Sequence, residues 1–205
     1  MSTANPRLRA DAVRNRQRTL EATRALLADP DATVTVEAIA TKAGVGAATV
    51  VRAFGGKEAL IDAAVSGLLA PLVQRARDLL SDMAPEEALR TFLLELIAFQ
   101  AAHHAMNAQV ETLDLPAAEV EQTRLQQAIL AMVSQARETG AIRTDLDATV
   151  TMTLISECTY AIARSRATSS ELAANYLTVL MDGLRPQTSD APPAKASSSP
   201  GSRSS

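Results

Sequence analysis

Aromatic residues and cysteine are scarce in this chain. Of its 205 residues none is Trp, and aromatic residues make up only 2%, whereas hydrophobic residues make up 47%. The apolar residues are therefore mainly Ala, Leu, Val and Ile, a composition that suits helices. The single cysteine, Cys158, cannot form an internal disulfide, which is typical of a protein in a reducing cytoplasm.

The chain also lacks the features of a membrane or secreted protein. It contains no run of about 18 uncharged apolar residues, so we expect no transmembrane segment. Its start, MSTANPRLRADAVRNRQR, has no apolar core of a secretion signal. We therefore expect a cytoplasmic protein with no membrane partner. A chain of 205 residues fits one medium-sized domain or two small ones, with a substantial core.

Motifs for catalysis or metal binding are missing as well. The sequence has no glycine-rich phosphate loop and no Cys-x-x-Cys pair. The only two histidines, His103 and His104, are adjacent, and adjacent helical side chains point about 100° apart, which makes a poor metal site. We interpret Cys158 as a small buried apolar residue rather than a nucleophile. The expectation is therefore no enzyme, no catalytic residue, no metal and no cofactor.

Charge is distributed unevenly along the chain. The overall net charge is −3, but residues 1–58 carry nine Lys or Arg and six Asp or Glu, a net charge of +3. The remaining residues carry eleven basic and seventeen acidic side chains, a net charge of −6. A basic head on an acidic body indicates local contact with DNA without non-specific coating.

The segment 35–60 contains two short helical patterns separated by a glycine. Four apolar residues have the i, i+3, i+4, i+7 spacing of one buried helical face: Val36, Ile39, Ala40 and Ala43. Gly44 ends this helix, because glycine tolerates the left-handed backbone of a helix stop. A helix of about two turns then runs to Ala53. This is the helix-turn-helix pattern, whose second helix enters the DNA major groove, although similar helix pairs occur in ordinary bundles.

The string AIATKAGVGAATVVRAFGGKEAL within this segment resembles the tetracycline-repressor (TetR) family of transcription regulators. In that family an alanine-rich helix, an AGV turn, a threonine, a phenylalanine and a Lys-Glu pair recur in this order. The matching positions are Ile39, Ala40, Ala43, Gly44, Val45, Thr49, Arg52, Phe54, Lys57, Glu58 and Leu60. The resemblance is strong over residues 14–65 and weaker over 85–186. It implies an all-α fold of about nine helices.

The resemblance also implies a division of the chain into segments. We expect a flexible arm at residues 1–10 and a helix-turn-helix domain of three helices at 11–56. A helical ligand-binding and dimerisation domain would follow at 57–186, and a disordered tail at 187–205. The tail is rich in Ser, Pro, Ala and Gly. Pro71 should bend the long helix that joins head and body. That bend is either a static kink or a path for conformational change.

The DNA contacts implied by the resemblance lie in the head. Three positions depart from the family: Gly46 replaces its usual Ser, Val51 an aromatic residue, and Ala53 a polar one. Val51 either packs on a thymine methyl or lies half-buried between helices. The other contacts would come from basic side chains, hydroxyls and backbone N–H groups at helix starts. The expected DNA-binding residues are Arg14, Arg16, Thr35, Gly46, Ala47, Ala48, Thr49, Val51, Arg52 and Lys57.

By the same resemblance a ligand pocket lies inside the body. Candidates chosen for bulk and position are Phe92, Phe99, His103, Met106, Met132, Met152, Glu157 and Tyr160. Large apolar residues at helical spacing are usually plain core, so each has an ordinary alternative. Glu157 in particular would be an outward glutamate paired with Arg124, and His103 a helix-end residue that touches solvent.

The last two helices, expected at about 146–166 and 170–184, pair in relatives with those of a second subunit as a four-helix bundle. Asp145 is the expected N-cap of the first of them. The expected dimer interface consists of Val150, Leu154, Ala161, Leu172, Tyr176 and Leu180. Small residues such as Ala161 would permit close helix approach.

These features together predict a homodimeric, DNA-binding transcription regulator. We expect a repressor that leaves a palindromic double-stranded DNA operator when an unknown small-molecule effector binds the C-terminal domain. The alternative is a helical interaction or scaffold module whose DNA readout has degenerated, because polar groups usual in the second helix are absent.

Overall fold

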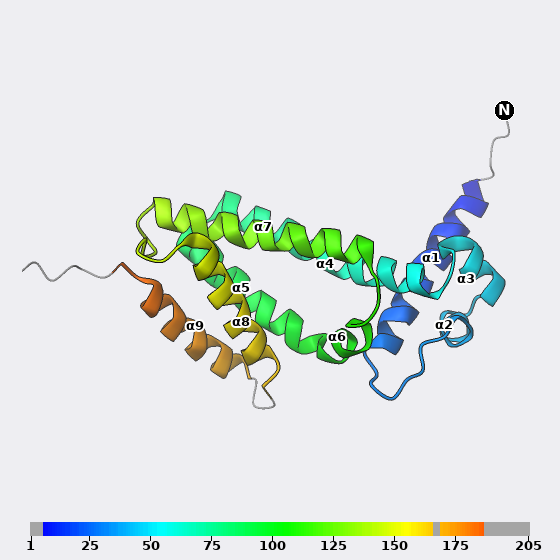
Figure 1. The fold of residues 1–205 in the computed structure, drawn as a ribbon. Coiled ribbons are helices and arrows are strands. Elements are labelled where there is room, and N and C mark those ends of the chain that lie inside the picture. Colours follow the sequence, from blue (N-terminus) through cyan, green and yellow to red (C-terminus); the bar gives the residue numbers. More distant parts are fainter. Residues whose placement is uncertain (1–5, 166–168, 187–205) are drawn as a thin grey trace, which may run out of the picture.

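The computed structural model describes residues 6–165 and 169–186, with side chains from residue 9 onward. In this part the chain forms nine α-helices and no strand, which confirms the predicted all-α class (Figure 1). The helices are α1 (Pro6–Leu27), α2 (Val36–Ala43), α3 (Ala47–Phe54), α4 (Lys57–Asp82), α5 (Pro85–Ala102), α6 (His104–Val110), α7 (Pro116–Glu138), α8 (Ala148–Ala163) and α9 (Ser170–Leu184).

The first helix begins earlier than the sequence pattern suggested. It starts at Pro6, because proline has its φ angle already set for a first helical turn, so residues 6–10 belong to α1 and not to a flexible arm. Val13 is 68% exposed, although it precedes the buried Leu27 by two heptads, a spacing that puts both on one side of the helix. The first turns of α1 extend past the helices on which it packs (Figure 1). The predicted tail, 187–205, lies outside the described residues.

The buried apolar residues form two clusters. The head cluster joins α1, α2 and α3 to the first half of α4, to α6 and to the start of α7 as far as Ala118. The body cluster contains the second half of α4 from Val73, together with α5, α7 from Leu125, α8 and α9. Packing of the head therefore continues past residue 56, where we placed the domain boundary. The division between clusters crosses α4 near Pro71.

α4 contributes its first half to the head cluster and its second half to the body cluster (Figure 1). By length and mean hydropathy alone it would be long and apolar enough to span a membrane. In the fold it instead packs against α1 and α3 in the head, against α5 in the body, and against α7 in both. That packing is typical of the central helix of a two-part bundle.

A buried carboxylate on α4 caps the start of α7. Asp62, only 9% exposed, accepts hydrogen bonds from the backbone N–H groups of Ala117 at 3.0 Å and Ala118 at 2.8 Å. These amides lie in the first turn of α7, where helix geometry provides no acceptor, and the preceding residue, Leu115, has no side chain that could cap them. Asp62 therefore replaces a local N-cap and fixes α7 to α4.

The connection between α7 and α8 differs from our expectation. Asp147, not Asp145, is the N-cap of α8, and the N–H groups of Thr149 and Val150 hold its pKa below the usual range. Asp145 instead pairs with Arg143, whose backbone N–H donates to the last carbonyl of α9 at 2.7 Å. The sequence offers two aspartates two residues apart, and this ion pair with the loop arginine decides which one caps the helix.

Replacing Asp62 with Ala should destabilise the fold by about 2–4 kcal/mol, because two buried backbone donors lose a charged acceptor. The free energy of unfolding in urea measures this effect. As a control, Asp78→Ala on the same helix removes an exposed carboxylate and should cost less than about 0.5 kcal/mol. Equal stabilities of the two variants would contradict the proposed capping role.

Candidate nucleic-acid interface

The start of α2 and the turn that follows it are fixed by local hydrogen bonds. The hydroxyl oxygen of Thr35 accepts from the N–H of Ala38 at 3.1 Å, so Thr35 is the N-cap of α2. This bond uses the oxygen as an acceptor and leaves the hydroxyl hydrogen free to be donated to a phosphate. Gly44 has φ +65°, so it adopts the left-handed conformation predicted for the helix stop.

α3 begins without a side-chain cap. Gly46 is its N-cap residue and makes no side-chain hydrogen bond. Helix geometry leaves the N–H groups of Ala47 and Ala48 without an intrahelical acceptor. Two free amides at a positive helix end are suited to bind a phosphate oxygen, and the small side chains allow the DNA backbone to approach.

The side chains of α3 divide into a buried and an outward face. Val50 is fully buried in the head cluster, while Ala48 and Arg52 are exposed. Val51 is 46% exposed, so it is not enclosed between helices and its methyl groups face outward. Figure 1 shows α3 at the end of the molecule opposite the body. The helix therefore offers a mostly apolar, small-residue surface in which Arg52 and Thr49 are the polar groups.

Arg16, expected to contact phosphate, is engaged within the head. Its guanidinium lies over the ring of Phe54, 4.3 Å from the centroid, and Nη1 donates to the carbonyl oxygen of Ala53 at 3.3 Å. Both partners belong to the last turn of α3, where carbonyl oxygens lack helical donors. Arg16 therefore holds the end of the recognition helix against α1. No local pattern marks this contact, because it joins residues 37 positions apart.

The other predicted basic contacts remain at the surface. Arg14 is exposed and lies 3.6 Å from the carboxylate of Asp11, an ion pair too open to hold it firmly. Lys57 is exposed at the first turn of α4. Neither position prevents the phosphate contact that the sequence suggested.

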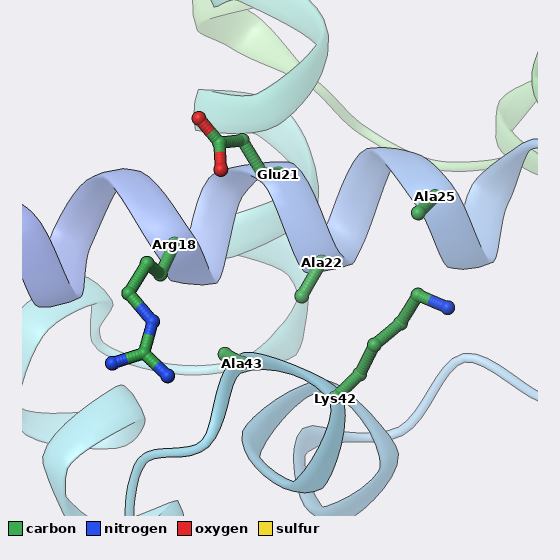
Figure 2. Close-up of a pocket in the computed structure, with 6 residues that line it drawn as sticks. All are labelled: Arg18, Glu21, Ala22, Ala25, Lys42 and Ala43. Carbon is green, nitrogen blue, oxygen red and sulfur yellow. The ribbon is translucent and has the colours of Figure 1, made fainter.

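Two further cations flank the crossing of α1 and α2. A surface hollow of about 300 Å³ lies between these helices, lined by Arg18, Glu21, Ala22, Ala25, Lys42 and Ala43. In Figure 2 Ala22 and Ala43 lie at the crossing, with Arg18 and Lys42 on either side of them. Arg18 also covers the turn: its Nη2 lies 2.5 Å from where a Cβ at Gly44 would be. Small residues let the helices approach, and the charges stay at the rim.

The residues predicted for a ligand pocket do not gather at one place. Phe92 and Met132 are fully buried in the body cluster, whereas Met106 belongs to the head cluster. Met152 packs at the edge of the body cluster. None of the eight predicted residues lines the hollow between α1 and α2. The same is true of a second hollow, of about 270 Å³, which is lined by Leu27, Pro30, Ala32, Val34, Lys57, Ile61, Gln109 and Leu113.

His103 has a local structural contact at the end of α5. Its ring lies 4.2 Å from that of Phe99, centroid to centroid, and its Nδ1 is 2.8 Å from the carbonyl oxygen of Phe99. The histidine ring therefore lies on a helix-end carbonyl that also accepts the backbone N–H of His103, at 3.1 Å. This geometry corresponds to the helix-end alternative more closely than to a ligand contact.

Glu157 and Tyr160 point away from the interior, which for Glu157 is the outward alternative and for Tyr160 differs from the expected pocket position. Both lie on the exposed side of α8, and Tyr160 is 36% exposed. The buried side of α8 contains Thr151 and Thr159, whose hydroxyls donate to carbonyls one turn earlier in the same helix. Because these threonines satisfy their own polar groups, they can be buried and the larger side chains turn outward. Arg124 pairs with Glu121 and not with Glu157.

Apolar residues follow the outward side of α8 over about three turns. Val150 and Leu154 are 50% and 51% exposed, and Cys158 and Ala161 continue the same side. Cys158 is thus exposed rather than buried as predicted. On α9, Val179 is 73% exposed, whereas the predicted interface residues Leu172, Tyr176 and Leu180 are half-buried. Burial, and next the adjacent Cys158 thiol, raise the pKa of Tyr176 to about 12.

Over residues 6–165 and 169–186 no group of three or more His, Cys, Asp or Glu side chains is arranged to hold a metal ion. The polar groups that do converge are the basic and hydroxyl side chains of the head. The arrangement therefore suits binding of a polyanion more than chemistry at a bound ligand.

Comparison with known proteins identifies the family. The model of the bacterial regulatory proteins of the tetR family matches residues 20–64, and the model of the C-terminal domain of SbtR-like transcriptional regulators matches residues 84–186. No curated protein matches the chain. The chain belongs to the TetR family of transcriptional regulators, which are DNA-binding proteins and not enzymes.

Solved structures agree with this assignment. A TetR regulatory protein from Mycobacterium vanbaalenii is 31% identical with a TM-score of 0.62, and the match covers 87% of this chain and 99% of that chain. A TetR regulator from Streptomyces coelicolor is 28% identical with a TM-score of 0.61, covering 84% and 99%. The regulator FadR from Bacillus subtilis, 17% identical over 82% and 99%, shares the fold with a TM-score of 0.69.

Arg16→Ala should destabilise the protein by about 1 kcal/mol, because it removes a cation–π contact and a hydrogen bond at the end of α3. Thermal unfolding of the full-length protein measures the change. Arg14→Ala removes an equal charge from an open ion pair and should leave the unfolding temperature unchanged within error. If Arg16→Ala were as stable as Arg14→Ala and only the salt dependence of DNA binding fell, Arg16 would be a phosphate contact instead.

Proposed function

We propose that this TetR-family regulator is a cytoplasmic homodimeric repressor that binds a palindromic operator and leaves it when a small molecule binds the body. The observation that carries the proposal is the head: α3 presents Thr49, Val51 and Arg52 outward, with free backbone amides at its start and basic side chains on α1 and α4. The body is acidic in sequence, so DNA contact is confined to the head.

The contacts on α3 divide into two kinds. Arg52 can form two hydrogen bonds to a guanine edge, and Val51 can pack on a thymine methyl, so these two would read sequence. The amides of Ala47 and Ala48 and the hydroxyls of Thr35 and Thr49 would position the helix on phosphates. With few side chains available to read bases, each half-site would bind modestly, and two linked heads would supply the affinity.

The dimer is supported by the uncovered apolar side of α8. Val150 and Leu154 each expose half of their side chains, although they stand on a helix whose other side packs into the body core. Pairing of α8 and α9 with the same helices of a second copy would remove these residues from water.

Response to a small molecule is supported by relatives. The B. subtilis FadR structure contains stearoyl-CoA. In this chain a ligand would have to separate residues of the body cluster such as Phe92, Met132 and Met152, which are packed together in the structure. The ligand would release DNA only if it bound one spacing of the two heads more tightly than the other.

The test is selection of genomic DNA fragments by the purified full-length protein at two salt concentrations. A dimeric operator binder should enrich a near-palindrome whose half-sites lie about 34 Å apart on one face of the duplex. Its affinity should also fall steeply with salt. Weak, salt-sensitive binding without enrichment would contradict the proposal and favour the interaction module with degenerate DNA readout.

Arg52→Ala should weaken binding to the selected operator by about 1–3 kcal/mol and relax the preference at one base pair in each half-site, because a base-reading hydrogen-bond pair is lost. Titrations with operator and with unrelated DNA measure the two effects. Arg77→Ala on the body provides the charge-matched control. An equal loss on all DNA sequences would make Arg52 a phosphate contact.

Leu154→Glu should convert the dimer to monomers at micromolar concentration, because a charge would have to be buried in the pairing surface of α8. Sedimentation velocity measures the change. Val120→Glu on α7 is a matched control, since Val120 is also about half exposed, at 49%. Persistent dimers of the Leu154→Glu variant would place the interface elsewhere.

A further inference from the structure

One arginine fixes α1 to the middle of α4. The Nε of Arg24 donates to the backbone oxygen of Ala64 at 3.0 Å, a contact between residues 40 positions apart. Its guanidinium also lies against Gly67, with Nη2 only 2.6 Å from the place that a Cβ at this position would occupy. Any side chain at residue 67 would push the guanidinium away. Gly67 is therefore the residue that lets Arg24 lie on the α4 backbone.

The Arg24 contact lies beside the place where Pro71 interrupts the backbone hydrogen bonds of α4. Pro71 has no N–H, so the carbonyl of Gly67 lacks the donor that an uninterrupted helix would provide. The two hydrophobic clusters divide at the same place, since Leu69 packs with the head and Leu72 with the body. The head thus joins the body within about one helical turn of the point that Arg24 holds.

α7, the second helix with residues in both clusters, is attached to the same part of α4. Asp62, which caps α7, is less than one turn before Ala64, the acceptor for Arg24. One short segment of α4 is therefore attached to α1 through Arg24 and to α7 through Asp62. Movement of the head relative to the body is then confined to α4 beyond Gly67 and to α7 beyond its first turn.

We propose that Arg24 is a positioning residue that sets which half-site spacing the dimer accepts. The proposal rests on the proposed function of operator binding by two heads. Each head is attached to the body through its own α4, so a change of angle beyond Gly67 displaces the head along the DNA. With the guanidinium in place on Gly67, the two recognition helices are held at one separation. Without it, the heads reach several separations.

The test compares operators whose half-sites are moved by one or two base pairs. Wild type should lose roughly tenfold or more in affinity at the altered spacings. The full-length variants Arg24→Met and Gly67→Ala should lose only about threefold or less, with the half-site sequence preference unchanged. Identical spacing profiles would overturn the proposal, and so would a uniform loss of affinity at every spacing, because that would assign Arg24 a merely structural role.

Two control variants separate the contact between Arg24 and Gly67 from other effects. Arg77→Met removes the same charge from an exposed position on the far half of α4 and should keep the wild-type profile. The double variant Arg24→Met/Gly67→Ala should match the single variants, because both substitutions remove one contact. Additive broadening would mean that Gly67 acts independently of Arg24 and would also count against the proposal.

A second measurement does not depend on DNA. Spin labels at Val13→Cys, in a Cys158→Ser background, report the distance between the two heads of a dimer. Arg24→Met should broaden this distance distribution relative to wild type, and an unchanged distribution would overturn the proposal. If wild type selects no operator, the proposed function fails, while the label distances still decide whether Arg24 restrains the heads.

Discussion

The fold depends on α4, each half of which is buried in a different hydrophobic cluster. The first half of α4 completes the head, and its second half completes the body. Neither cluster could be complete without it, because a three-helix head of short α2 and α3 buries too little apolar surface to be stable alone. The same fact makes α4 the route by which any change in the body reaches the DNA-binding surface. Polar contacts on α4, rather than its apolar surface, determine how tightly the two parts are joined.

The composition of the recognition helix, α3, explains why the attachment of the head to the body matters. α3 has few polar side chains, and its end is held by the stacking of Arg16 on Phe54 rather than by contacts of its own. If α3 reads DNA mainly with Arg52, small residues and backbone amides, as proposed, it would have to be placed accurately, since amides cannot adjust as long side chains do. Specificity would then depend less on side-chain chemistry and more on the position of the head.

The sequence was sufficient for the helices and insufficient for contacts between distant residues. Glycine and proline determine helix ends locally, which is why the predicted bounds of α2, α3 and α9 lie within about one residue of those observed. Asp62 and Arg24 act on residues 55 and 40 positions away, and no local pattern marks them. The orientation of α8 was misjudged at Tyr160 because threonine counts as polar in any pattern, yet Thr151 and Thr159 are fully buried.

The apolar side of α8 and the contact of Arg24 with α4 both bear on the distance between the two recognition helices of a dimer. In a dimer formed through α8 and α9, the distance between the two recognition helices would be determined by three joints: the pairing surface and one α4 in each subunit. The pairing surface offers apolar contact over several turns and is stiff. Each α4 has a proline at the boundary between clusters, and on the head side of that boundary it is attached to α1 by one arginine and to α7 by one aspartate. The head-to-head distance is therefore most easily changed at the α4 joints, which is where binding of a ligand among the body helices would act.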